Sequence, residues 1–123
     1  MVKGKDKGNK WELEVLRDLK KIDNMAHRSI GSGNAKDESG DIFFGPYMIE
    51  CKHHKKIGAT QVRRWWKKIA AESFGTDFEP LLVMKENWRE PLVCYKEGDL
   101  YTFHYYKDWM RWLKDDEREV CIP

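Results

Sequence analysis

Three charged residues interrupt an apolar and aromatic stretch, GDIFFGPYMIECKHH, at residues 40–54. Asp41 stands near its start, and Glu50 and Lys52 stand near its end. Carboxylate oxygens are ligands that Mg²⁺ and Mn²⁺ favour. A lysine beside them can orient or help to deprotonate a water, or stabilise negative charge developing on a phosphate. These residue types suit a divalent-metal site that acts on phosphate groups.

The spacing predicts a hairpin that brings two of these charges together. Residues 41–44 and 47–52 have the composition of strands and are joined by the turn residues Gly45-Pro46. A hairpin centred on this turn pairs residues whose numbers sum to 91, which sets Asp41 opposite Glu50. Directly opposed carboxylates, with Cβ atoms roughly 5 Å apart, repel each other. A bound Mg²⁺ or Mn²⁺ would remove the repulsion, so the pair predicts a metal site.

Strand alternation separates the charges from the cysteine between them. Glu50 and Lys52 should point to one face of the strand, and Cys51 to the other, beside Ile49. Alone, a Glu-x-Lys tripeptide is common at surfaces and favours a cross-strand ion pair over a catalytic site.

The remaining pattern predicts a mixed α/β or α+β domain. Thr60 is the expected N-cap of the second of three helices, which should end near Gly75. The other expected elements are helices at 8–22 and 107–119 and strands at 25–30, 80–85, 91–96 and 99–106. The order α-β-β-β-α-β-β-β-α predicts a mixed sheet flanked by helices.

Length and composition favour one intracellular domain. A chain of 123 residues with 41% hydrophobic content can bury one core but not two, so we expect a single domain over residues 1–123. No apolar run resembles a membrane span or a signal peptide. Three widely spaced cysteines, an odd number, argue against a disulfide framework. We therefore expect a soluble, cytoplasmic protein that has no membrane partner.

Positive charge is concentrated directly after the hairpin. Residues 52–68 carry seven Lys or Arg and no acidic residue, whereas residues 69–106 carry three basic and seven acidic residues. Such a block is typical of a polyanion-binding face, although a solvated helix face would look the same. The candidate phosphate-binding residues are Lys55, Lys56, Arg63, Arg64, Lys67 and Lys68.

Two further motifs give the pattern a family resemblance. Gly40-Asp41, a hairpin and then Glu50-Cys51-Lys52 resemble the PD-(D/E)XK nuclease signature, with glycine where proline usually precedes the aspartate. The G-x-x-x-E segment from Gly8 to Glu12 and R-S-I-G-S from Arg28 to Ser32 precede it. Together they resemble the archaeal-type Holliday junction resolvases of this superfamily, over residues 8 to about 85.

The resemblance implies a restriction-endonuclease-like fold and roles for individual residues. Asp41 and Glu50 would bind Mg²⁺, for which Mn²⁺ could substitute, with the backbone carbonyl of Cys51 as a further ligand. Lys52 would be the catalytic lysine. Glu12 would hold a water on the metal or a second ion.

Three further roles follow from the same resemblance. Arg28 and Ser32 would contact the scissile phosphate or its neighbour. Gln61 is similar to the glutamine that several nucleases of this superfamily place beside the active site, although a polar helix face explains it equally well.

The implied activity is metal-dependent hydrolysis of DNA phosphodiesters that leaves a 5′ phosphate. We expect a structure-selective endonuclease that acts on branched, four-way DNA junctions and needs no nucleotide cofactor. The polar loop at residues 31–39 would touch a junction arm. A related nuclease for duplex, flap or single-stranded DNA, and a non-catalytic nucleic-acid-binding module, stay open as alternatives. So does a cellular or a viral role, in which case the protein would act in the host cell.

Two other signals have competing explanations. The string Cys51-x-His53-His54 could suggest zinc, but alternation would send His54 to the opposite face. The aromatic C-terminal part, which includes Trp88, Trp109 and Trp112, could stack on bases. We favour self-association of this region as a homodimer, because a small domain can rarely bury so many aromatic side chains. Two-fold symmetry would then supply two active sites for paired cuts.

Overall fold

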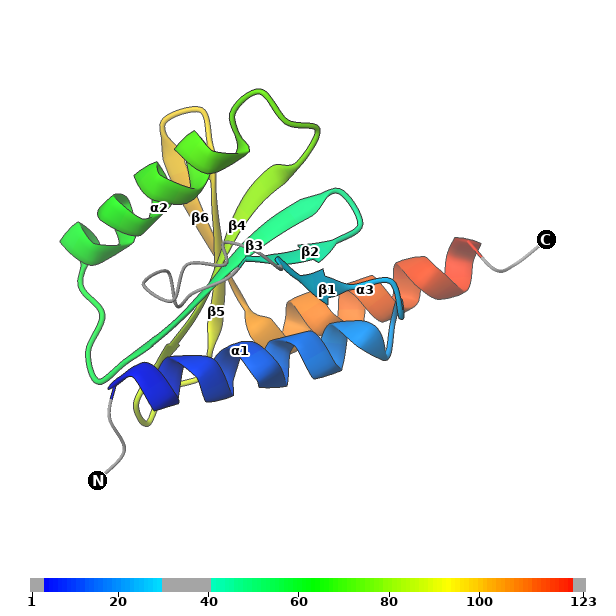
Figure 1. Cartoon of the computed structure of the whole chain (residues 1–123), viewed down its shortest axis with the longest axis horizontal. Helices are drawn as coiled ribbons and strands as arrows, with labels where there is room; N and C mark the ends of the chain where they lie inside the picture. Colours follow the sequence, from blue (N-terminus) through cyan, green and yellow to red (C-terminus); the bar gives the residue numbers. More distant parts are fainter. Residues whose placement is uncertain (1–3, 30–40, 121–123) are drawn as a thin grey trace.

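The part of the chain that the structure describes, residues 4–29 and 41–120 of a computed structural model, forms one six-stranded sheet with helices on both faces (Figure 1). The strands follow the order β1-β2-β3-β4-β5-β6, and β3 and β4 are parallel while the other neighbours are antiparallel. The elements are α1 (Gly4–Lys20), β1 (His27–Arg28), β2 (Ile42–Phe44), β3 (Tyr47–His54), α2 (Ala59–Ser73), β4 (Glu79–Glu86), β5 (Leu92–Glu97), β6 (Leu100–Tyr105) and α3 (Tyr106–Val120). The predicted α+β fold and its order of elements are confirmed.

The boundaries differ at the N-terminal part of the chain. Helix α1 begins at Gly4, four residues before the expected start, because residues 4–7 are polar and leave no apolar pattern to mark the first turn. It ends at Lys20, and the Leu19 carbonyl accepts hydrogen bonds from both Ile22 N and Asp23 N in the turn that follows. Strand β1 pairs only two residues with β2 among those described.

The β2–β3 hairpin has the predicted register. Ile42 pairs with Ile49 and Phe44 with Tyr47, so paired residue numbers sum to 91. Gly45 has φ +53°, the positive value that a two-residue type II′ turn requires at its first position. Pro46 then supplies a fixed negative φ at the second position. The turn therefore sets the position of every residue along both strands.

Helix α2 connects the parallel strands β3 and β4, and its start corrects one prediction. Thr60 is not the N-cap: Gly58 holds that position, and its carbonyl accepts from Val62 N at 3.1 Å. Gln61 Oε1 accepts from Gly58 N at 2.8 Å. A side chain three residues into the helix thus satisfies the backbone group that precedes it.

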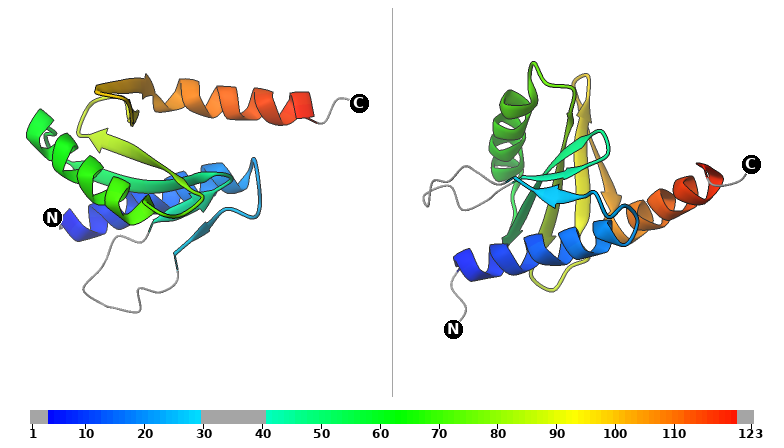
Figure 2. Two further views of the ribbon diagram at one scale, coloured as in Figure 1. Left: turned by 90° about the horizontal axis from the view of Figure 1, so that it is seen from above. Right: turned by 45° about the vertical axis from the view of Figure 1, so that its right-hand side comes forward.

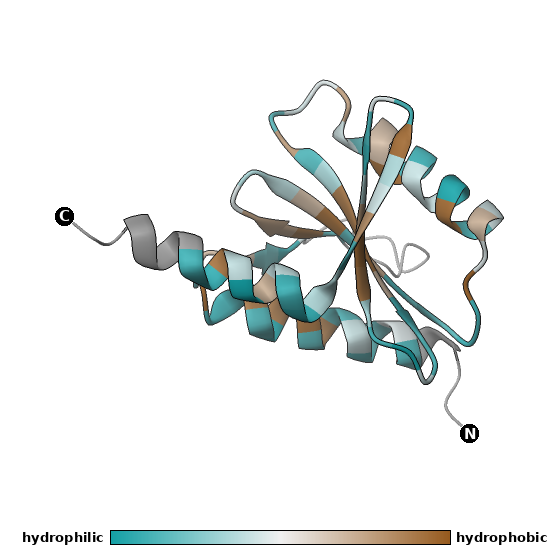
Figure 3. Cartoon of the chain, turned by 180° about the vertical axis from the view of Figure 1, so that it is seen from behind, coloured by the Kyte–Doolittle hydropathy of each residue, from teal (hydrophilic) through white to brown (hydrophobic). Residues whose placement is uncertain are grey.

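The sheet buries a different set of side chains on each face. On one face, α1 and α3 pack against β2–β5 through residues such as Trp11, Val15 and Trp109. On the other, α2 packs against β3 and β4 through Trp65, Trp66 and Ile69, among others. Figure 2 (right) shows α2 on one side of the strands and α1 and α3 on the other. In Figure 3, which is coloured by hydropathy, the hydrophobic colour is concentrated in the central strands. In the described residues, no helix is long and apolar enough to cross a membrane.

A buried contact of α2 should control stability. Ile69 has no exposed surface, so Ile69→Ala removes apolar contacts and leaves a cavity against the sheet. We expect a loss of about 2–5 kcal/mol in the free energy of unfolding, measured by urea denaturation. Lys67→Ala, two residues away on the exposed side of α2, serves as the control and should change it by less than about 0.5 kcal/mol. Similar losses in both variants would contradict this packing.

Candidate metal centre and its surroundings

Three carboxylates from three elements meet at one edge of α2. Asp41 directly precedes β2, Glu50 lies in β3 and Glu72 lies in the last turn of α2, and one oxygen of each lies within 4.8 Å of the others. We call these three residues the acidic cluster. Among the described residues, it is the group of acidic, histidine or cysteine side chains with the spacing of a metal site.

Backbone pairing brings the first two carboxylates together. The hairpin register, continued by one residue beyond Ile42, sets Asp41 opposite Glu50. Ser29 N donates to the Asp41 carbonyl at 2.7 Å, so the segment after β1 holds the backbone of Asp41 from its other side. Glu72 is added by the packing of α2 on β3 and β4.

Two buried oxygens of the cluster accept no hydrogen bond within the described residues, although lysines lie near one of them. Glu50 is 2% exposed, and Asp41 Oδ1 and Glu50 Oε1 are both buried without a hydrogen-bond donor in the described part of the chain. Burial, with the adjacent carboxylates of Glu50 and Glu72, raises the pKa of Asp41 to about 9. A group with this pKa holds a proton at neutral pH because a third negative charge is unfavourable there. The donor set of three carboxylates fits a divalent cation, which would take the place of that proton.

Two lysines lie beside the cluster. Lys52 Nζ is 3.2 Å from Glu50 Oε1, and it also lies over the ring of Trp65, 5.7 Å from the centroid. Lys68 Nζ lies 4.0 Å from Glu50 Oε1 and 3.9 Å from Glu72 Oε1. Cys51 contributes its side chain to the core on the α1 side of the sheet, as alternation predicted. The cation of Lys52 is thus held at the rim of the cluster by both an ion pair and an aromatic ring.

Helix α1 supplies a fourth buried carboxylate close to the cluster. Glu12 is 2% exposed, and Arg28 Nε donates to its Oε1 at 2.7 Å. Burial raises the pKa of Glu12, and the positive charge of Arg28 opposes that rise. The charges of Glu50 and Lys52 also act on Glu12. The structure therefore directs Glu12 inward, although it follows the buried Trp11.

Comparison with family models decides the classification. A model described as "Phage putative PDDEXK endonuclease" matches residues 3–119, nearly the whole chain. The chain belongs to this family. Comparisons with curated proteins and with solved structures found no match.

Membership in this endonuclease family accords with the acidic cluster, since carboxylates that can bind a divalent metal are typical of PD-(D/E)XK nucleases. The predicted superfamily is therefore confirmed, and the matched model extends the relationship beyond residue 85 into the aromatic C-terminal part.

Gln61 lies elsewhere than expected. It sits in the first turn of α2, where its side chain caps Gly58, whereas Glu72 and Lys68 occupy the end of α2 beside the hairpin. Gln61 and Glu72 are eleven residues apart, about 16 Å along the helix axis. The structure does not bring Gln61 to the acidic cluster.

Glu72 is the residue that sequence reasoning missed. Trp65 and Lys68 recur at helical spacing, and continuing that stripe by one turn reaches Glu72. The helical spacing is visible in the sequence. No local feature, however, indicates that a carboxylate on this helix will lie next to two carboxylates of the hairpin.

The other predicted residues lie in three places. Ser32 and the loop at 31–39 fall outside the described residues. Lys55 and Lys56 are exposed in the connection between β3 and α2, and Arg63, Arg64 and Lys67 are exposed on α2. Burial and the carboxylates of Glu12 and Glu50 raise the pKa of the Cys51 thiol well above its usual value, so the backbone carbonyl, rather than sulfur, stays the predicted ligand of this residue.

The zinc alternative has no geometric support. His53 Nε2 pairs with Asn87 Oδ1 at 2.9 Å, while His54 packs against the ring of Trp65. The two histidines thus contact different elements, as alternation predicts, and in the described part of the chain they join no group of metal-ligating side chains.

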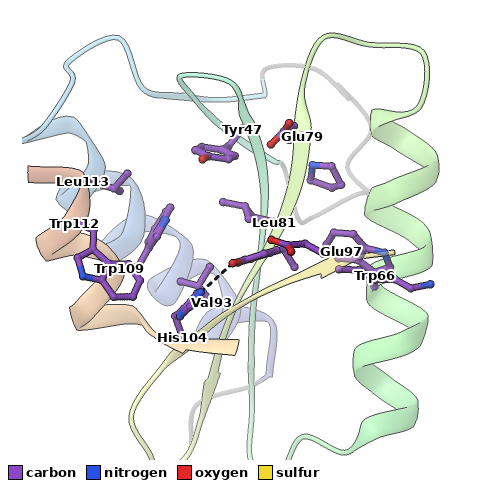
Figure 4. Close-up of a pocket in the computed structure, with 13 residues that line it drawn as sticks. Tyr47, Trp66, Glu79, Leu81, Val93, Glu97, His104, Trp109, Trp112 and Leu113 are labelled. Atoms are coloured by element: carbon purple, nitrogen blue, oxygen red, sulfur yellow. Dashed lines mark hydrogen bonds between the residues drawn. The ribbon is translucent and has the colours of Figure 1, made fainter. Parts of the chain in front are cut away.

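A cavity of about 620 Å³ lies apart from the acidic cluster. Figure 4 shows it between α2 and α3, with Trp66, Trp109 and Trp112 around it and a hydrogen bond between Tyr95 Oη and His104 Nε2. None of the three clustered carboxylates lines it. The acidic cluster, and not this cavity, is therefore the candidate metal site.

The raised pKa of Asp41 predicts a pH dependence of stability. In its folded state Asp41, with its pKa of about 9, keeps its proton well above neutral pH, while the unfolded chain releases it near the ordinary aspartate pKa of 3.8. The folded state therefore binds more protons across this window, and its stability must fall as pH rises. In EDTA, the melting temperature of the parent protein should fall more between pH 5 and pH 8 than that of Asp41→Asn, and Mg²⁺ should restore more stability at pH 8 than at pH 5. Parallel pH profiles for the two proteins would contradict the shift.

Glu72 predicts a contribution to metal affinity that the hairpin alone would not provide. Glu72→Gln keeps the size of the side chain but removes one of three carboxylates, so affinity for Mn²⁺, followed by the electron spin resonance of the free ion, should fall about tenfold or more. Glu14→Gln, which removes an exposed carboxylate from α1, provides the control and should leave affinity unchanged. Equal affinities for all three proteins would exclude Glu72 from the site.

Proposed function

We propose that this member of the endonuclease family is a Mg²⁺-dependent, structure-selective nuclease that resolves four-way DNA junctions by paired hydrolysis of phosphodiesters. The observation that carries the proposal is the acidic cluster with Lys52 at its rim, 3.2 Å from Glu50. The paired motif of Glu12 and Arg28, on which the resemblance to junction resolvases rests, lies beside it.

Asp41, Glu50 and Glu72 would hold the divalent cation, with the carbonyl of Cys51 as a further ligand. When bound, the cation supplies Lewis-acid polarisation of the phosphate and activation of the attacking water. The carboxylates must keep the cation close to the anionic phosphate. Asp41 and Glu50 are suited to this, because each has a buried oxygen that accepts no hydrogen bond in the described residues.

Lys52 is the proposed catalytic lysine. Its ion pair and its contact with Trp65 fix the ammonium at one edge of the cluster, where it can orient the attacking water or stabilise negative charge on the phosphate. Water adds to phosphorus, the bond to the 3′ oxygen breaks, and the products are a 5′ phosphate and a 3′ hydroxyl.

Glu12 and Arg28 are proposed to act as a pair. Arg28 remains partly exposed, with 39% of its side-chain surface accessible, although it binds Glu12. It can therefore contact a phosphate next to the scissile one while it holds Glu12 toward the cluster. Ser32 is proposed for the same region of the substrate.

Phosphates outside the site would be neutralised by the exposed basic side chains. Lys68 lies closest to the cluster, and the others are Lys55, Lys56, Arg63, Arg64 and Lys67. Contacts to phosphate carry no base information, so binding should depend strongly on salt and little on sequence. Selection would then depend on the shape of the DNA.

A homodimer is part of this proposal. A four-way junction has two-fold symmetry, and a symmetric pair of subunits would present two sites for paired cuts. Phe103, Tyr105 and Trp112 are about half exposed on β6 and α3, and apolar side chains of this kind are suited to an interface.

The family description names phage, and we infer that the protein acts inside the host cell.

The second candidate is a nuclease of the same chemistry that acts on linear duplex, flap or single-stranded DNA. It is favoured by the description of the matched family, which names an endonuclease but no junction. The two candidates share the acidic cluster and differ only in the DNA that fits around it.

One gel assay tests both candidates. A labelled four-way junction is mixed with purified protein, Mg²⁺ and an excess of unlabelled linear duplex. We expect symmetric nicks near the branch point, and their loss in Asp41→Asn and in Lys52→Ala, while both variants still shift the junction in a binding gel.

The other outcomes are equally informative. An intact junction with degraded linear or single-stranded DNA would exclude the resolvase activity and favour the second candidate. If neither the parent protein nor the variants cleave any DNA with Mg²⁺ or Mn²⁺, the enzyme proposal is wrong, and a non-catalytic DNA-binding module becomes the better explanation.

A further inference from the structure

Helix α2 forms a ridge on its face of the sheet, with a different site on each flank. It packs on the central strands β3 and β4, so the sheet extends past it toward β2 on one side and toward β6 on the other. The acidic cluster lies on the β2 side, where Glu72 faces Asp41 and Glu50.

The opposite flank holds a basic cleft. It has a volume of about 570 Å³ and lies between α2 and the β5–β6 hairpin. Thr60, Arg63, Arg64 and Lys67 line it from α2, and Lys96, Asp99 and Tyr101 line it from the hairpin. We call these seven residues the basic cleft.

The cleft carries an excess of positive charge with few internal partners. Four of its side chains are cationic and one, Asp99, is acidic. Within the described residues, neither Arg63, Arg64 nor Lys67 forms an ion pair at 4.0 Å or less. Cations gathered around one hollow repel each other, and an anion in the hollow removes that repulsion.

Aromatic contacts hold one wall of the cleft in place. The ring of Tyr101 meets that of Trp66 edge to face, with centroids 6.4 Å apart, and Lys96 Nζ lies over Tyr101 at 5.6 Å. Trp66 belongs to the core between α2 and the sheet. The position of the Lys96 cation is therefore linked to the packed core, although Lys96 itself is exposed.

Helix geometry separates the cleft from the acidic cluster. Arg63 and Glu72 are nine residues apart, which at 3.6 residues per turn puts them about 180° apart around the axis and about 13 Å apart along it. The body of the helix, about 10 Å wide with its side chains, stands between them. A straight duplex with one phosphate at the acidic cluster lies along one flank of the ridge, and the cleft faces the other flank.

We propose that the basic cleft binds the phosphodiester backbone of a second DNA arm, while the arm to be cut lies at the acidic cluster on the other flank of α2. This inference rests on the proposed function and names its substrate more closely, as DNA whose arms diverge around a helix. Arg63, Lys67 and Lys96 would contact phosphates of the second arm.

The test measures binding apart from cleavage. In an Asp41→Asn background with Ca²⁺, the charge reversals Lys67→Glu and Lys96→Glu are combined, and Kd is measured by fluorescence anisotropy for a labelled four-way junction and for a short linear duplex. The matched control combines Lys20→Glu and Lys114→Glu, which change the net charge equally at exposed positions of α1 and α3.

We expect the cleft variant to bind the junction roughly tenfold or more weakly. The slope of log K against log salt concentration should decrease by the equivalent of about two phosphate contacts. Its Kd for the short duplex should change less than about threefold. The control should alter both affinities by a similar, small factor. Equal losses for junction and duplex would overturn the inference, because the cleft would then serve the same arm as the acidic cluster. Unchanged binding to both would overturn it as well.

The result remains distinct from that of the cleavage assay. Suppose that the parent protein cleaves no junction, but the cleft variant loses junction binding selectively. The proposed function would then be refuted, and the proposed role of the cleft would be supported. Junction cleavage by the parent, together with no selective loss in the cleft variant, would support the function and refute the cleft.

Discussion

Repulsion among three carboxylates is the constraint on which the site depends. Asp41, Glu50 and Glu72 have oxygens within 4.8 Å of each other, two of them in side chains that the fold largely removes from water. Such an arrangement costs free energy unless a proton, a lysine or a metal ion compensates it. The hairpin register fixes the backbones of Asp41 and Glu50, and the packing of α2 adds Glu72. A bound cation would remove the repulsion among the three carboxylates.

The rest of the fold limits this cost without removing it. Lys52 and Lys68 both approach Glu50, but at 3.2 and 4.0 Å they neutralise only one side of the cluster. Arg28 is committed to Glu12, 2.7 Å away, and so keeps a fourth carboxylate from adding its full charge. No cation in the described residues pairs with Asp41, and its Oδ1 accepts no hydrogen bond there. A cluster fully paired with lysines would be more stable but less suited to a metal.

Local features explain why the hairpin could be predicted from the sequence. The turn at Gly45-Pro46 fixes the register, and strand alternation fixes which face Glu50 and Lys52 share, so a few neighbouring residues determine the first half of the site. Glu72 could not be predicted in the same way, because its position depends on how α2 lies across β3 and β4. The same limit applies to Gln61. The sequence shows the helix face on which Gln61 lies, but α2 crosses the sheet so that its C-terminal end, with Glu72, lies at the hairpin, and its N-terminal end, with Gln61, lies away from it.

Helix boundaries were harder to predict than helix faces, for a related reason. Gly58 is the N-cap instead of Thr60 because the Gln61 side chain can reach back to the Gly58 amide, which makes a cap without a polar side chain at the cap position. For Glu12, helical periodicity left the direction open because Trp11 beside it is also buried. Its pairing with Arg28, sixteen residues away, helps to offset the cost of burying an acid at that position.

The arrangement separates the chemistry from the choice of substrate. The residues proposed for hydrolysis come from a hairpin, one turn of α2 and the buried side of α1, all held by packing or backbone pairing. The exposed basic residues of α2 and the β5–β6 hairpin can change without disturbing that packing, because none of Arg63, Arg64 and Lys67 belongs to the core. A family that keeps one fold and one hydrolytic site can therefore accept different DNA shapes by altering the surface on either side of α2. For this chain, positive charge without ion pairs in the described residues, on the flank opposite the acidic cluster, would favour the proposed DNA that occupies both flanks at once.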